Sequence, residues 1–184
     1  NPDSLLIGDK NAILIAVRQT GFGSTYATTI GCSSCGAQNE KQFSLEDKEI
    51  KESDPQEGTT LLENGNFLIH DEDYNLNIEI RLLTGRDETR ITKTLEQRKK
   101  LKKEVGTVTT MLESIVVGVN ELRDRSAIQQ VIAAMPVSLS RRIRTIYDSV
   151  MPNISIYADF ECDHCNHAGR LEVPIGLDFF WPDL

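Results

Sequence analysis

The chain has 184 residues, of which 39% are hydrophobic and 26% are charged, and its formal net charge at pH 7 is -8. This composition is typical of a soluble globular protein that can bury a core, and no apolar stretch is long enough to cross a bilayer. The acidic excess opposes nonspecific attraction to the phosphates of nucleic acid. These bulk properties argue against a membrane protein and against a general nucleic-acid binder.

The first element expected is an apolar helix over residues 9–20. Asp9 can cap its start, and Gly21 and Gly23 end it. The residues from Ala12 to Val17 are apolar on nearly every side of the helix. Such a helix is predicted to lie in a core or in an interface.

A hairpin with a cysteine pair at its tip is expected at residues 24–47. Its Cys-x-x-Cys sequence is both preceded and followed by a run with strand character. A second copy of this pattern is expected at residues 153–176, so the two segments look like one hairpin written twice. The cysteines of the two pairs are Cys32, Cys35, Cys162 and Cys165, and the chain has no others.

The segment after the first hairpin is predicted to begin as an exposed acidic connection. Residues 46–73 are acidic and poor in large apolar side chains, although residues 67–69 favour a short strand. Residues 74–83 alternate between apolar and polar side chains, which indicates a strand. Residues 107–119 fit a helix or a strand, with residues 115–117 favouring the strand.

The inserted region 74–150 is predicted to be chiefly helical toward its end. Thr84 starts one helix. Ser126 opens another through a capping box, and Pro136 ends it. Ser138 then caps a third helix, and the short connection makes the last two helices neighbours.

The helix that begins at Thr84 ends in a basic run. Cations near a helix C-terminus complement the helix dipole, so a solvated face is the simplest interpretation. The functional interpretation is an electrostatic contact with an acidic partner surface. The candidate contact residues are Lys99, Lys100, Lys102 and Lys103.

An aromatic tail is expected over residues 177–184, because Pro174 and Gly176 end the return strand of the second hairpin. Aromatic rings left in water forfeit the free energy of burial and promote aggregation. The tail is therefore expected either to fold back on its own core or to insert into a pocket of a partner. The candidate contact residues are Phe179, Phe180, Trp181 and Pro182.

The two cysteine pairs together predict a structural zinc site. Two thiolates separated by two residues at a hairpin tip can point at one ion, and two such tips complete the tetrahedron that zinc prefers. Gly36 and Asn166 follow the pairs and tolerate the left-handed backbone that turns amides toward the sulfurs. Four thiolates leave no open position, so one structural zinc per chain is expected. Its predicted ligands are Cys32, Cys35, Cys162 and Cys165.

Other interpretations of the cysteines are weaker. Disulfides within each pair would be strained, and disulfides between the pairs would need an oxidising compartment. A thioredoxin-like redox role needs a pair that opens a helix, which neither pair does. An iron–sulfur cluster also takes four thiolates and stays open as an alternative. His164 and His167 are the candidate substitutes if one cysteine is not a ligand.

No pattern for catalysis accompanies the metal site. The chain has no glycine-rich phosphate loop and no nucleophile-elbow sequence. Its three histidines, His70, His164 and His167, form no ligand spacing apart from the second cysteine pair. We therefore expect no enzyme activity and no small-molecule substrate.

The order of these pieces resembles a known family. The N-terminal helix leads through Gly21-Phe22-Gly23 to Cys32-Ser33-Ser34-Cys35-Gly36, and the insertion leads to Cys162-Asp163-His164-Cys165-Asn166-His167 and Phe179-Phe180-Trp181-Pro182. This arrangement looks like the baseplate hub assembly proteins, also described as tail assembly proteins, of T-even-type contractile-tailed bacteriophages. The resemblance implies a non-enzymatic role in building the baseplate hub or inner baseplate through contacts with other tail proteins. It places the protein in the host cytoplasm during assembly and leaves its retention in the virion tail open. Only the four cysteines carry over from the family, as metal ligands.

The sequence thus predicts an α+β fold in which a split four-cysteine zinc ribbon carries a long, largely helical insertion. A single compact unit over residues 1–184 is expected because neither cysteine pair can complete the metal site alone. The alternative functions are a zinc-ribbon adaptor or regulator that binds proteins and, after it, a nucleic-acid-binding ribbon.

Overall fold

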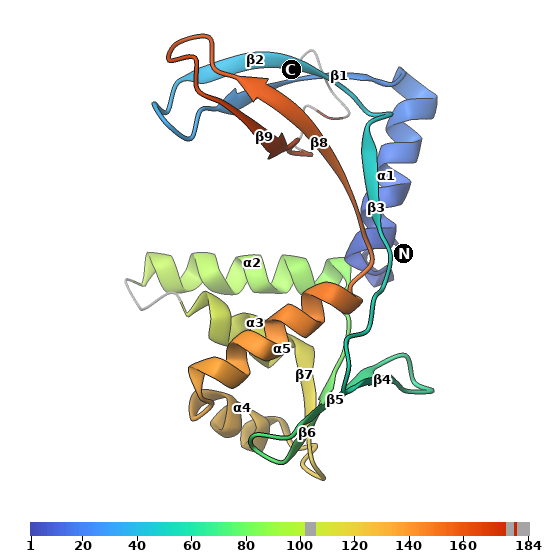
Figure 1. The fold of residues 1–184 in the computed structure, drawn as a ribbon, viewed down its shortest axis with the longest axis vertical. Coiled ribbons are helices and arrows are strands. Elements are labelled where there is room, and N and C mark those ends of the chain that lie inside the picture. Colours follow the sequence, from blue (N-terminus) through green and yellow to red (C-terminus); the bar gives the residue numbers. More distant parts are fainter. Residues whose placement is uncertain (102–105, 176–178, 180–184) are drawn as a thin grey trace. The chain divides into compact units, whose positions relative to one another are not determined.

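The computed structural model of the protein describes residues 1–101, 106–175 and 179 (Figure 1). The chain divides into two compact units, which are described separately below. Each unit has its own cluster of buried apolar side chains. This division differs from the single compact unit expected from the sequence, because the insertion builds a core that shares no buried residue with the metal-binding part. Unit 1 consists of Asn1–Lys10 and Glu52–Pro152, and unit 2 of Asn11–Lys51 and Asn153–Leu184.

Unit 1 contains an antiparallel sheet with the strand order β4-β5-β6-β7. Cross-strand pairs of buried apolar residues set its register, as Phe67 lies opposite Ile80 and Ile69 lies opposite Ile78. The strand predicted over residues 74–83 is present over the shorter range Leu76–Ile80. The strands are β4 (Thr59–Leu61), β5 (Phe67–Asp71), β6 (Leu76–Ile80) and β7 (Val116–Val119).

Three helices of unit 1, α3, α4 and α5, bury apolar side chains in the same core as the sheet. Along α5, Leu139, Ile143, Ile146 and Val150 recur at helical spacing and are all buried, which gives this helix one apolar face. The region 107–119 is a helix that passes directly into a strand, so both interpretations of it were partly right. The helices are η1 (Pro2–Ser4), α2 (Gly85–Lys100), α3 (Thr107–Ile115), α4 (Arg125–Ala133) and α5 (Val137–Val150).

Unit 2 consists of the cysteine hairpins, one further strand and most of the N-terminal helix. The helix α1 spans Ile7–Phe22, which confirms the predicted helix and extends it at both ends. The first hairpin pairs β1 with β2, and the second forms a sheet of order β3-β8-β9. The strands are β1 (Thr25–Gly31), β2 (Gln38–Ser44), β3 (Lys48–Lys51), β8 (Asn153–Glu161) and β9 (Ala168–Glu172).

Three local predictions differ from the structure. The acidic segment 46–73 contains more strand than predicted, because it supplies β3 and β4 as well as the β5 expected around residues 67–69, although most of it lies outside strands. The helix α4 is capped by Asp124 and not by Ser126, since the Asp124 carboxylate accepts a hydrogen bond of 2.9 Å from the Ala127 amide. The helix α5 begins at Val137, with Pro136 at the cap position predicted for Ser138.

Candidate metal centre

The first cysteine pair lies in a tight turn between β1 and β2. The Cys32 amide donates to the carbonyl of Ala37 at 2.9 Å, and the Gly36 amide donates to the carbonyl of Cys32 at 2.8 Å. The Ser34 amide lies 3.4 Å from the Cys32 Sγ and points a donor at it. Gly36 has a φ of +74°, which glycine adopts without strain. This turn therefore directs both thiols of the pair to one side.

The second cysteine pair repeats the same turn between β8 and β9. The Cys162 amide donates to the carbonyl of His167 at 2.9 Å, and the Asn166 amide donates to the carbonyl of Cys162 at 3.0 Å. The His164 amide lies 3.4 Å from the Cys162 Sγ. Asn166 has a φ of +55°, in the place that glycine takes in the first turn. The two segments are indeed one hairpin written twice, at the level of individual hydrogen bonds.

The two turns bring all four thiols together. The four Sγ atoms lie within 4.8 Å of one another, and all four cysteines are free of disulfides. The Sγ atoms of Cys32 and Cys165 are 3.7 Å apart, as are those of Cys35 and Cys162. A tetrahedron with zinc–sulfur bonds of about 2.3 Å has edges of about 3.8 Å. The two separations of 3.7 Å match such an edge, so the four thiols could hold a single tetrahedral metal ion.

The inner and outer cysteines differ in exposure. Cys32 and Cys162 are buried in the core of unit 2, whereas Cys35 and Cys165 are exposed. One thiol of each pair thus belongs to the hydrophobic core, and the other closes the site at the surface. A metal ion held by the four would link the two hairpins through that core.

The thiols do not ionise alike. Burial opposes ionisation of Cys162, but the amides of His164 and Cys165 donate to its sulfur, and its pKa is lowered to about 6. The Ala37 amide acts to lower the pKa of Cys35, but hydrogen bonds with the neighbouring thiols and burial outweigh it and raise that pKa to about 12. One thiolate is thus favoured before a cation arrives, and a cation at the centre favours ionisation of the rest.

A polar contact that the sequence did not reveal joins the two turns. Asn39 on β2 is only 2% exposed, and its Oδ1 accepts a hydrogen bond of 2.8 Å from the Asp163 amide in the second turn. Its Nδ2 donates to the carbonyl of Ala37 at 2.9 Å in the first turn. Lys41 forms an ion pair with the Asp163 carboxylate. The signal in the sequence was a polar residue at an inward position of a strand.

The histidines beside the second pair are not among the clustered donors. Within the described residues, the only group of metal-binding side chains that lies together consists of the four cysteines. His167 instead has its Nε2 3.4 Å from the Oγ of Ser33, so it bridges the two turns. The substitution of a thiolate by His164 or His167 therefore finds no support in the geometry.

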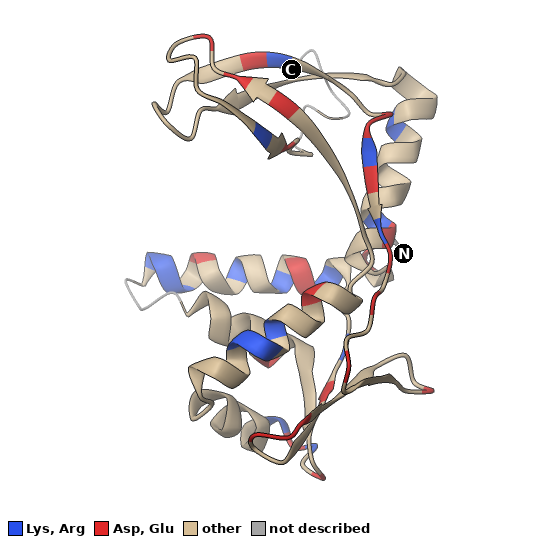
Figure 2. Ribbon diagram, in the orientation of Figure 1, with Lys and Arg blue, Asp and Glu red and all other residues tan. Residues whose placement is uncertain are grey.

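The other predicted contact residues fall into three groups. Lys99 and Lys100 are exposed at the end of α2, along which Lys and Arg recur (Figure 2). Phe179 is fully buried and packs edge-on against Tyr26, with ring centroids 4.9 Å apart, so it is a core residue of unit 2 and not a surface anchor. The remaining candidates lie outside the described residues, namely Lys102, Lys103, Phe180, Trp181 and Pro182.

The comparisons with known proteins bear on the whole chain. The family model described as T4 bacteriophage base plate protein matches residues 1–181. No curated protein and no solved structure gives a significant match. Within the part of the chain that the structure describes, no helix is both long enough and apolar enough to span a membrane. The match covers both units and all four cysteines, and the chain therefore belongs to the T4 bacteriophage base plate protein family.

Proposed function

We propose that the protein is a non-enzymatic structural or assembly component that helps to build the hub or inner part of a phage baseplate. The observation that supports this role most directly is the family match over residues 1–181. The predicted partners are other baseplate or tail proteins, met in the host cytoplasm during assembly. Retention of the protein in the finished tail is part of the proposal.

We further propose that one structural zinc ion is held by the four cysteines. Support comes from the sulfur–sulfur distances of 3.7 Å and from the four-thiolate donor set, which is closed to water and substrate. Zinc in such sites contributes directly to folding, with apparent binding free energies of about 10–16 kcal/mol in small peptides. The metal would therefore stabilise unit 2 and would take no part in chemistry.

Elemental analysis tests the metal assignment. Protein purified without added metal is expected to contain one zinc per chain and to be colourless. The variant Cys162→Ser is expected to lose the metal and to unfold unit 2. The matched variant Ser34→Ala, which keeps the backbone amide of this exposed residue, should retain both the metal and the fold. Detection of iron together with visible absorption would show that the site holds an iron centre and not zinc. Absence of any transition metal would end the proposal.

Tail assembly tests the role. A phage that lacks this protein and is complemented with a tagged copy should yield tails in which the tag is detected by mass spectrometry. Without the copy, electron microscopy should show incomplete baseplates.

Deletion of residues 180–184 tests the aromatic tail, since it leaves Phe179 in place. A truncated protein that keeps its metal but no longer supports tails would assign a partner contact to Phe180, Trp181 and Pro182. Normal tails without the protein would contradict the proposed role.

A further inference from the structure

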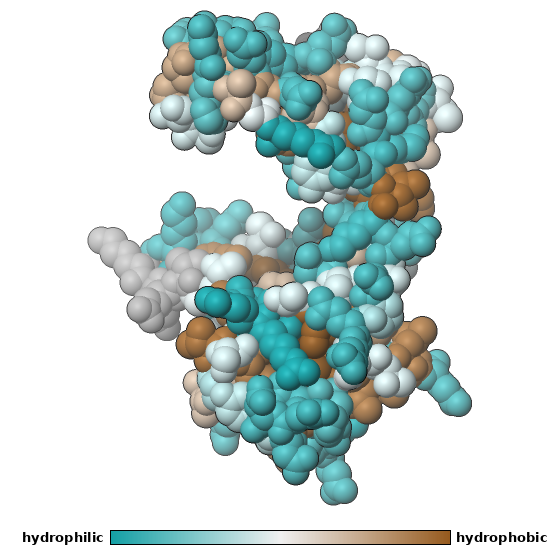
Figure 3. Space-filling view, viewed as in Figure 1, coloured by the Kyte–Doolittle hydropathy of each residue, from teal (hydrophilic) through white to brown (hydrophobic). Residues whose placement is uncertain are grey.

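The surface shown in Figure 3 is mostly hydrophilic, and its apolar residues form small, separate patches. The most exposed large apolar side chains, Val137 and Ile50, belong to different units. No single apolar face therefore stands out as a docking surface in this view. Charged side chains therefore offer a better candidate for a binding site than apolar ones.

Unit 1 contains a pocket of about 190 Å³ that is lined by four arginines. Arg81 follows β6, Arg90 lies on α2, Arg123 follows β7, and Arg125 is the first residue of α4. The pocket also has apolar lining, including the buried side chains of Val116 and Ile128. We call this site the arginine pocket. Its basic lining contrasts with the net charge of -8 of the whole chain.

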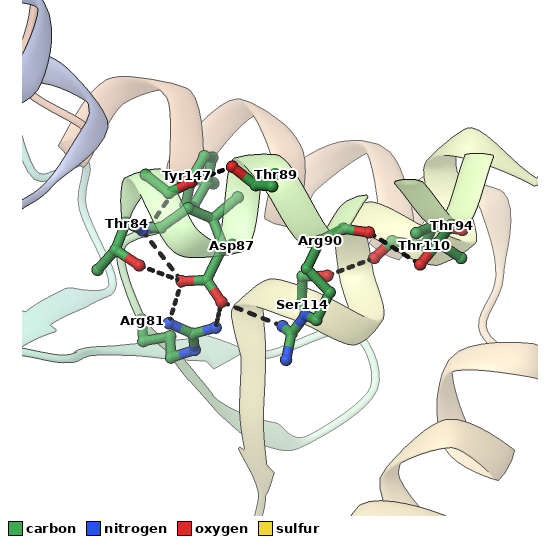
Figure 4. Close-up of polar contacts among 11 residues, drawn as sticks. Arg81, Thr84, Asp87, Thr89, Arg90, Thr94, Thr110, Ser114 and Tyr147 are labelled. Atoms are coloured by element: carbon green, nitrogen blue, oxygen red, sulfur yellow. Dashed lines mark hydrogen bonds and ion pairs between the residues drawn. The ribbon is translucent and has the colours of Figure 1, made fainter. Parts of the chain in front are cut away.

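The carboxylates around the arginine pocket do not balance its positive charge. Asp87 alone serves two guanidinium groups, with its Oδ1 2.8 Å from Nη2 of Arg81 and 3.1 Å from Nη2 of Arg90 (Figure 4). Arg123 pairs with Glu79 at 3.1 Å.

Arg125 has neither an ion pair nor a hydrogen bond from its side chain within the described part of the chain. Glu113, the one acidic residue among those lining the pocket, is likewise unpaired there. Four arginines thus face three carboxylates, which leaves one positive charge.

Two of these arginines are held in place before any ligand binds. The Asp87 carboxylate grips Arg81 through two hydrogen bonds of 2.8 Å and is itself fixed by the Thr84 amide at 3.0 Å. Arg123 lies over β7 so closely that a Cβ atom at Gly118 would be 2.5 Å from its Nη1. Arginines that are already ordered lose less conformational entropy when they bind a ligand. Arg90 and Arg125, both exposed, are the ones with free donors for a ligand.

The chemistry of the pocket favours a carboxylate on a short apolar stem. Guanidinium groups pair with carboxylates through two parallel hydrogen bonds. The apolar lining suits the methylene groups of a Glu side chain better than a fully hydrated phosphate. The net charge of -8 further disfavours a phosphate-rich polymer. A volume of about 190 Å³ suits one or two such side chains.

We propose that the arginine pocket binds the acidic side chains of a Glu- or Asp-bearing segment of another baseplate protein. The inference rests on the proposed function, because it takes the partner from the same assembly. Arg90 and Arg125 form the charged contacts, and Arg81 and Arg123 hold the pocket open and positive.

Fluorescence anisotropy with the purified, metal-loaded protein tests the proposal. The probe is a fluorescein-labelled six-residue peptide of alternating Glu and Leu, and its control has Gln in place of Glu. The Glu peptide is expected to bind saturably, and the Gln peptide is not. The double variant Arg90→Gln and Arg125→Gln should weaken it by at least about tenfold, because two charge-assisted contacts are lost.

A matched variant separates the pocket from the overall charge. Arg86 and Arg141 are exposed arginines of unit 1 outside the pocket, and neither has a side-chain partner within the described residues. The double variant Arg86→Gln and Arg141→Gln removes the same charge and should bind the peptide as the parent protein does. Circular dichroism checks that both variants fold. The variant Arg90→Lys with Arg125→Lys keeps the charge but loses the fork geometry, so it should bind with intermediate affinity.

Several results would overturn the proposal. These are absence of saturable binding by the parent protein, equal weakening in both Gln variants, and tighter binding of a single-stranded 12-nucleotide DNA that the pocket variant abolishes. None of these results contradicts the proposed function, which is tested separately by the presence of the tagged protein in tails. If the protein enters tails but binds no acidic peptide, the pocket inference alone fails.

Discussion

Asn39 shows how one polar side chain can connect segments that are distant in the sequence. Its Oδ1 accepts from the second cysteine turn and its Nδ2 donates to the first, so both turns are fixed relative to each other without metal. Inward positions of a half-buried strand are usually apolar, and Asn39 is a polar exception that is only 2% exposed. A sequence alone cannot identify the partner of such a residue, because Asp163 lies 124 positions away.

Replacing Asn39 by Ala should speed metal loss. The substitution removes the buried Asn39 side chain and leaves the Asp163 amide without its acceptor in a partly buried hydrogen bond, which costs about 1–3 kcal/mol. Release of zinc to a chromophoric chelator should therefore become roughly tenfold faster or more. Gln38→Ala, an exposed neighbour on the same strand, is the control and should leave the rate unchanged. Equal rates in Asn39→Ala and the parent protein would show that the bridge does not matter.

Asp87 should make the stability of unit 1 depend on pH. The hydrogen bonds from Arg81 hold the pKa of Asp87 well below its usual range of about 4. Because the folded pKa is lowered, the stabilisation is fully present above about pH 4 and is lost as the pH falls further. Asp87→Asn should thus lower the free energy of unfolding by about 2–3 kcal/mol at pH 7, and the difference should shrink below pH 4.

Urea unfolding followed through NMR signals of unit 1 at pH 7, 5 and 3 measures this difference. Glu88→Gln is the matched control, because Glu88 is half exposed and, among the described residues, forms a surface ion pair with Lys10 alone. An exposed pair of this kind contributes less than about 1 kcal/mol. A gap between Asp87→Asn and the parent protein that stays constant from pH 7 to pH 3 would contradict the assignment.

At the scale of elements, the sequence predicted the strands and helices with a strong period and missed those set by tertiary contacts. The two hairpins, α1 and the buried face of α5 follow directly from residue patterns. The strands β3 and β4 do not, since their residues are mostly polar and exposed, and they exist because β8 and β5 supply backbone partners. The cap at Asp124 was missed because Ser126 offered an equally good local signal.

The burial of Phe179 makes the start of the aromatic tail part of unit 2. Phe179→Ala should lower the free energy of unfolding of unit 2 by about 3–5 kcal/mol, because the ring is fully buried against Tyr26. Thermal unfolding and zinc content measure the effect. The double variant Lys99→Gln and Lys100→Gln changes exposed side chains of α2 and should shift stability by less than about 1 kcal/mol. An unchanged melting temperature in Phe179→Ala would contradict the assignment of this ring to the core of unit 2.

At the scale of the whole molecule, the metal should stabilise one unit and not the other. The two units have separate hydrophobic clusters, and the four cysteines belong only to unit 2. The sequence could not reveal this division, since the size of the insertion does not tell whether its apolar residues join the ribbon core or form their own. The clustering of the four thiols was predictable, because they are all the cysteines of the chain and stand in two pairs of matching spacing.

Removal of the metal should therefore unfold the protein in part. After treatment with a strong chelator, amide hydrogen exchange is expected to accelerate throughout the strands of unit 2, while the amides of β5, β6 and α5 in unit 1 keep their protection. Re-addition of zinc should restore the slow exchange. Loss of protection in both units together would show that they fold as one cooperative body, as the sequence alone suggested.

The separation of the two cysteine pairs has a consequence for synthesis on the ribosome. Cys35 and Cys162 are 127 positions apart, so translation must pass through Glu52–Pro152 before the second pair emerges. Until then the growing chain carries two thiols of a four-thiol site, and β1 and β2 lack the hairpin that covers their core. A chain that ends before Cys162 lacks half of the four thiols and cannot complete the site. If the four thiols hold the proposed zinc, metal binding would therefore mark the chains whose translation has passed the second hairpin and would distinguish them from shorter fragments.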